Sequence, residues 1–130
     1  MLQVMVVSPE GTIGEFLKAN LSPSYFRVSV VSPGAGFVPA SRREHPEIAV
    51  IDSVDERPAA AQLEIELLKE ICPEIRIIAL TQKSSPKDAD IVEQGVFYYM
   101  TSIAGAELIQ IIEAAARLIE KQGIKSFDHE

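Results

Sequence analysis

The stretch His45-Pro46-Glu47-Ile48-Ala49-Val50-Ile51-Asp52 carries the strongest indication of the fold. Its centre, residues 48–51, is a continuous apolar run that is too short for a helix. Such runs are typical of strands in a parallel sheet that is covered on both faces. An aspartate follows at once, so a polar side chain is expected at the carboxyl end of a buried strand.

Four similar runs predict further strands over residues 4–7, 26–31, 76–80 and 96–100. Between them, apolar residues recur at helical spacing, at Ile13, Phe16, Leu17 and Leu21, at Leu63, Leu67, Leu68 and Ile71, and at Leu108, Ile111, Ile112, Ala115, Leu118 and Ile119. Residues 86–94 predict a short helix, with proline in its first turn and glycine just past its end. Residues 39–44 predict only a short or distorted helix, because glycine and proline precede them.

Strands that alternate with helices predict a doubly wound α/β domain, in which right-handed crossovers join five parallel strands and helices cover both faces. We expect this domain to occupy residues 1–122. Residues 123–130 are polar and are expected to form a frayed tail.

Composition excludes several classes of protein. The 130 residues are 47% hydrophobic and 24% charged, as in ordinary globular domains, and the net charge is -7. A negative surface repels phosphate backbones and anionic lipids, so we expect no nucleic-acid or membrane partner. The amino terminus reads as a strand and not as a signal peptide, and the single cysteine, Cys72, cannot form an internal disulfide. A cytoplasmic location is therefore expected.

In open parallel sheets, functional residues lie beyond the carboxyl ends of the strands. The residues at these positions are Ser8-Pro9-Glu10, Ser32, Asp52-Ser53, Thr81-Gln82 and Thr101-Ser102. A carboxylate such as Asp52 can act as a nucleophile toward a phosphoryl donor. It can equally cap the following loop.

Three segments, in this order and spacing, resemble the receiver domains of two-component response regulators: His45 to Asp52, Ile77 to Thr81, and Gly95 to Thr101. The resemblance extends from Val4 to about Lys121. It implies a flavodoxin-like sheet with the strand order 2-1-3-4-5. It also implies that Asp52 is the phosphoacceptor, and that Thr81 supplies the hydroxyl that binds the phosphoryl group during switching. Without that role, Thr81 would simply end its strand.

The chain departs from the family at two charged positions. Receiver domains hold Mg²⁺ between the phosphoacceptor and an acidic pair after the first strand, because the transferring group gathers negative charge. Ser8 and Pro9 stand at the acidic pair here, which leaves Glu10 and Asp52 as a weak Mg²⁺ site. Glu10 can also be a solvated residue near a helix start. Ser102, or Thr101 in a shifted register, replaces the family's lysine.

Receiver domains contact partners through the face formed by their fourth helix, fifth strand and fifth helix. In this sequence, that face comprises residues 86–94, 96–100 and the final helix, and Tyr99 holds the position of the family's switch aromatic. Tyr98 and Tyr99 are adjacent, so in a strand they point to opposite sides of the sheet. An exposed tyrosine is a plausible interface anchor. The expected partner is a histidine kinase or an output protein. A second copy of the chain, forming a homodimer, is an alternative partner.

The first hypothesis is a non-enzymatic receiver-like interaction module that works without phosphorylation or with weak phosphorylation. The second is a functional single-domain response regulator that a histidine kinase phosphorylates on Asp52. A third, from another class, is a flavodoxin-like nucleotide-binding domain. It has little support, because no glycine-rich phosphate loop follows the first strand.

Overall fold

A computed structural model of the chain describes residues 2–33, 37–52, 57–80, 98–100 and 105–128. Its strands are β1 (Leu2–Val7), β2 (Phe26–Val31), β3 (Ile48–Ile51), β4 (Arg76–Leu80) and β5 (Tyr98–Met100). Its helices are α1 (Thr12–Asn20), α2 (Phe37–Glu44), α3 (Pro58–Ile71) and α5 (Gly105–Asp128). All paired strands are parallel, in the order β2-β1-β3-β4-β5. This confirms the predicted doubly wound α/β fold.

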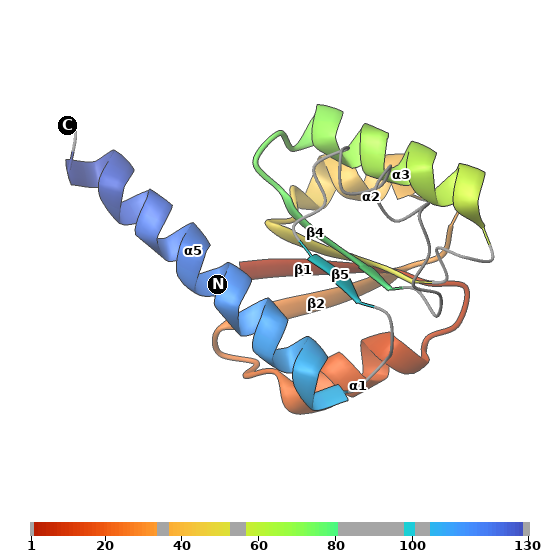
Figure 1. Cartoon of the computed structure of the whole chain (residues 1–130), viewed down its shortest axis with the longest axis horizontal. Coiled ribbons are helices and arrows are strands. Elements are labelled where there is room, and N and C mark those ends of the chain that lie inside the picture. Colours follow the sequence, from red (N-terminus) through yellow and green to blue (C-terminus); the bar gives the residue numbers. More distant parts are fainter. Residues whose placement is uncertain (1, 34–36, 53–56, 81–97, 101–104, 129–130) are drawn as a thin grey trace.

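The strands β1, β3 and β4 are largely buried on both faces, as the continuous apolar runs predicted. In β1, Val4 and Val6 belong to one core cluster, whereas Met5 and Val7 belong to the other. The first cluster packs against α1 and α5, and the second against α2 and α3. Figure 1 shows the same division, with α2 and α3 on one side of the sheet and α1 and α5 on the other.

Helix α2 is longer than the short segment 39–44 that the sequence predicted, because it begins at Phe37. Phe37 and Ala40 are buried in the core, and such packing outweighs a weak intrinsic propensity. Pro39 is tolerated because it lies in the first turn. The helix ends at Glu44. The next residue, His45, has a left-handed φ of 46°, and its N–H donates to the Ser41 carbonyl at 3.0 Å.

The backbone of helix α5 continues past residue 123, where the sequence predicted a frayed tail. It spans 24 residues and its backbone is helical through Asp128. No proline interrupts it, so no residue within this span lacks a backbone donor. In Figure 1 the C-terminal turns of α5 extend beyond the end of the sheet. The division of the chain at residue 122 stays a prediction, and the helix expected over residues 86–94 lies outside the described residues.

Candidate functional site

Asp52 and Ser8 are neighbours because the carboxyl ends of β3 and β1 lie side by side. Val7 pairs with Ile51 in the parallel register, and the Asp52 N–H donates to the Val7 carbonyl at 2.9 Å. The Ser8 N–H in turn donates to the Val31 carbonyl of β2 at 3.1 Å. The main chain therefore fixes both residues just beyond the strands, at the sheet edge where the sequence placed the site.

The Ser8 side chain contacts the Asp52 carboxylate directly. Ser8 is 2% exposed, and its Oγ lies 2.8 Å from Asp52 Oδ2 and 2.5 Å from the Glu10 carbonyl oxygen. A hydroxyl has one hydrogen, so it can donate to only one of these two acceptors at a time. The Glu10 N–H donates back to Ser8 Oγ at 3.2 Å. Ser8 thus presents a neutral hydroxyl to the half-buried Asp52.

The main chain of Glu10 reaches this site, while its side chain is solvent-exposed. Among the described residues, no group of three or more histidine, cysteine, aspartate or glutamate side chains is arranged to hold a metal ion. The weak Mg²⁺ site of Glu10 and Asp52 stays a prediction.

A buried ion pair holds the Asp52 main chain to α3. Arg57 donates from one terminal nitrogen to the Asp52 carbonyl oxygen at 2.9 Å. The same guanidinium forms a two-pronged contact with Glu64 of α3, at 2.8 and 3.3 Å. The side chains are 18% and 7% exposed. An ion pair of this kind is costly to break, because either charge alone would be left buried without its partner.

The sequence interpretation missed Arg57 and Glu64. One signal was available, since Glu64 falls on the apolar side of α3 together with Ala61, Ile65 and Leu68. A charged residue at such a position needs a partner of opposite charge. Nothing in the local sequence, however, shows that this partner also binds the Asp52 carbonyl.

The other predicted site residues are described only in part. The backbone of Tyr98 and Tyr99 lies in β5, opposite Ile78 and Ala79 of β4. Thr81, Thr101 and Ser102 lie outside the described residues.

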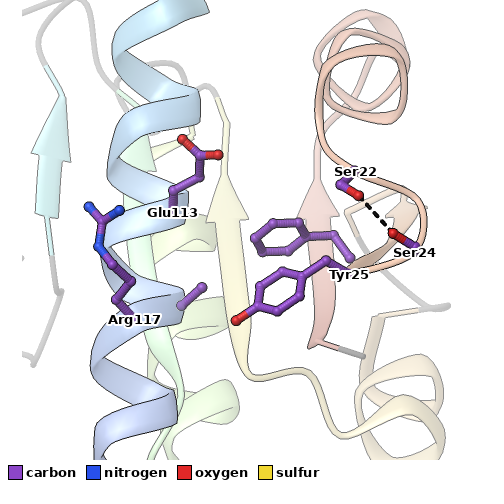
Figure 2. Close-up of a pocket in the computed structure, with 7 residues that line it drawn as sticks. Ser22, Ser24, Tyr25, Glu113 and Arg117 are labelled. Atoms are coloured by element: carbon purple, nitrogen blue, oxygen red, sulfur yellow. Dashed lines mark hydrogen bonds between the residues drawn. The ribbon is translucent and has the colours of Figure 1, made fainter.

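A separate pocket lies near the amino end of β2 and against α5, away from the Asp52 edge. Figure 2 shows the Tyr25 ring facing α5, with Ser22 and Ser24 on one side and Glu113 and Arg117 on the other. Phe26 also lines the pocket. The rings meet edge to face, with centroids 4.9 Å apart, and the cavity measures about 460 Å³. None of the described residues that were predicted for the functional site lines this pocket.

No protein-family model matches the chain, and no curated protein sequence matches it significantly. Solved structures do match. A response regulator from Thermotoga maritima aligns with a TM-score of 0.74 and 21% identity, over 88% of this chain and 97% of its own. The signal receiver domain of a LuxO repressor from Vibrio parahaemolyticus has a TM-score of 0.77 and 11% identity, over 95% of each chain.

A third neighbour is a response regulator from Burkholderia pseudomallei whose structure holds a phosphorylated aspartic acid and a calcium ion. It has a TM-score of 0.71 and 17% identity, over 96% of this chain and 75% of its own. Identities this low establish the architecture and leave the chemistry to the residues of this chain. The chain therefore has the fold of response-regulator receiver domains.

Proposed function

We propose that this chain is a receiver-fold interaction module of a signalling pathway, which works without phosphorylation of Asp52 or with only weak phosphorylation. It has no catalytic activity of its own, acts in the cytoplasm and binds a kinase or an output protein. The described helices include none that is long and apolar enough to span a membrane.

The contact between Ser8 and Asp52 is the observation that carries this proposal. Phosphoryl transfer to a carboxylate needs a divalent cation to offset the charge on the transferred group. In receiver domains an acidic pair helps to bind that cation, whereas this chain places a buried neutral hydroxyl 2.8 Å from Asp52 Oδ2. A hydroxyl can donate a hydrogen bond to one carboxylate oxygen without a metal, and it adds no negative charge that would attract one.

A phosphodonor assay tests the proposal. The chain is incubated with acetyl phosphate and Mg²⁺, and intact-mass spectrometry measures the fraction that gains one phosphoryl group. We expect wild type to label no more, or only slightly more, than Asp52→Asn, which lacks the nucleophile. A wild-type chain that labels fully, with the label lost in Asp52→Asn, would contradict the proposal.

Such labelling would instead establish the second candidate function, a single-domain response regulator phosphorylated on Asp52. One observation favours this candidate. Asp52 lies at the carboxyl end of the central strand β3 and is only half-buried, so a donor can reach its side chain. In this case Glu10, Asp52 and water would hold Mg²⁺, and Thr81 would bind the phosphoryl group.

A further inference from the structure

The outer side of α3 exposes apolar side chains beside acidic ones. Leu63 is 55% exposed, the largest value among the big hydrophobic residues whose side chains are described. Ala60 and Leu67, three residues before it and four after it, share its side of the helix. Ala60 is exposed and Leu67 half-buried. We call the surface formed by Ala60, Leu63, Glu66, Leu67 and Glu70 the α3 face.

The α3 face stands on a rigid base. The opposite side of the helix buries Ala61, Ile65 and Leu68 completely against the sheet. The Arg57–Glu64 ion pair also ties α3 to the Asp52 carbonyl. A surface held in this way loses little conformational entropy when a partner binds, so more of the contact energy contributes to affinity.

The acidic residues of the α3 face are available to a partner. Glu66 and Glu70 are exposed, and they form no hydrogen bond or ion pair with any other described residue. The neighbouring cation does not neutralise them, because Lys69 donates to the Ile75 carbonyl at 3.0 Å. Two copies of this face would repel each other, since each carries these acids and each chain has a net charge of -7.

From the exposed leucine, the exposed acids and the packed base of the helix, we infer that the α3 face is a docking surface for an amphipathic helix of a partner protein. The partner helix presents an apolar stripe to Leu63 and Leu67, with lysine or arginine beside it to meet Glu66 and Glu70. Two helices can pack in this way by placing the side-chain ridges of one into the grooves of the other. The inference rests on the proposed function and specifies the class of partner that the chain binds. The docking surface it names differs from the partner-binding face that the sequence predicted around β5 and the final helix.

A designed peptide tests the inference. A synthetic helical peptide with a leucine stripe flanked by lysines is titrated into the full ¹⁵N-labelled chain, and amide NMR locates the contact. We expect shifts on the α3 face, and a leucine–glutamate peptide of the same pattern should give none. Leu63→Ala should weaken binding by about fivefold or more, as truncation of an interface anchor does. Leu118→Ala is the matched control, because Leu118 is 40% exposed on α5, and it should change nothing.

A second variant tests whether peptide binding depends on the acidic residues of the α3 face. Glu66→Gln combined with Glu70→Gln should weaken binding and reduce its dependence on salt, because exposed charge pairs are screened. Shifts centred on α5, or equal losses in Leu63→Ala and Leu118→Ala, would overturn the inference. Those outcomes leave the proposed function in place with another surface, whereas strong labelling of Asp52 in the phosphodonor assay would count against the proposed function itself.

Discussion

Ser8 determines what the Asp52 carboxylate can bind. Its hydroxyl is buried and hydrogen-bonded on two sides, so it has a fixed position beside Asp52 Oδ2. An acid at this position would add a second carboxylate, and the pair would repel each other unless a cation lay between them. One residue therefore separates a neutral hydrogen-bonded site from a potential cation site.

Ser8→Asp tests this role. Without metal, the variant should lose about 2 kcal/mol of unfolding free energy, because a buried charge stands beside a like charge. Millimolar Mg²⁺ should restore part of that loss, and thermal unfolding with EDTA or Mg²⁺ measures both effects. Ser8→Ala, the control, should lose about 1 kcal/mol with its hydrogen bond and show no Mg²⁺ response. If Mg²⁺ does not change the thermal unfolding of Ser8→Asp, the other ligands of a cation site are absent.

Cys72 offers a test of electrostatics at the other end of α3. Burial, and secondly the negative charge of Glu47, raise the pKa of the thiol above the ordinary 9.0. The unfolded chain then ionises first, so this group lowers stability as pH rises above 9.0. Iodoacetamide alkylation, followed against pH, should show a midpoint above that of the unfolded chain. Glu47→Gln should lower the midpoint only in part, because burial is the larger cause. Equal midpoints for folded and unfolded chains would contradict this account.

Sequence reasoning at the residue scale located Asp52 and the substitution of Ser8, because both follow from where strands end. It did not predict that the Ser8 hydroxyl would bond to Asp52, since that contact joins residues 44 positions apart. Arg57 and Glu64 were missed for a similar reason. Their pairing depends on how the start of α3 packs against the end of β3.

At the scale of elements, α1 and β2 approach closely at Gly14. A Cβ atom built on Gly14 would lie 2.1 Å from Val30 Cγ2, so only glycine fits without movement. Gly14→Ala should therefore lower the unfolding free energy by about 1–2 kcal/mol, although alanine favours helix. Urea denaturation measures the change. Gly11→Ala is the control, because nothing lies within 4 Å of its Cβ position.

The Val30→Ala background should reverse the sign of this effect, because it removes the obstructing methyl group. There, Gly14→Ala should stabilise the chain by about 0.5–1 kcal/mol through helix propensity alone. If Gly14→Ala has the same effect in both backgrounds, the close approach does not limit α1.

The Arg57–Glu64 ion pair connects α3 to the Asp52 carbonyl at the end of β3. Arg57→Ala should cost about 3–5 kcal/mol, because it leaves Glu64 charged and buried. Arg57→Met combined with Glu64→Leu should recover most of that loss, since two apolar residues need no partner. Chemical denaturation measures both. Arg43→Ala is the matched control and should cost at most about 1 kcal/mol, because Arg43, paired with Glu44, is 71% exposed.

Element boundaries were the least predictable part of the chain. Residues 37–38 begin α2 because they pack on the core, which the glycine and proline content of the segment did not indicate. The helical end of α5 was missed because a polar composition was taken to indicate fraying. In both cases the local sequence was ambiguous, and the rest of the molecule determined the outcome.

For the whole molecule, the sequence predicted the architecture because a parallel sheet covered on both faces leaves an unambiguous pattern. Each strand is apolar throughout or nearly so, and each of the crossovers that the structure describes, from β1 as far as β4, carries a helix. The same pattern is shared by proteins with many functions, so it cannot identify the chemistry. That depends on a few side chains at the strand ends, and Ser8, which contacts Asp52, stands where the sequence predicts one member of the acidic pair of receiver domains.

The most direct test of phosphorylation-independent function is an amide NMR titration of the wild-type chain with Mg²⁺, followed by Mg²⁺ and beryllofluoride, which mimics a phosphoryl group. Because Ser8 and not an acid faces Asp52, we predict that the spectrum stays unchanged at millimolar concentrations of both. Saturable shifts that centre on Asp52 and spread to β5 would contradict the account. They would show that the chain binds the cation and the phosphoryl mimic, and that it switches as an active response regulator does.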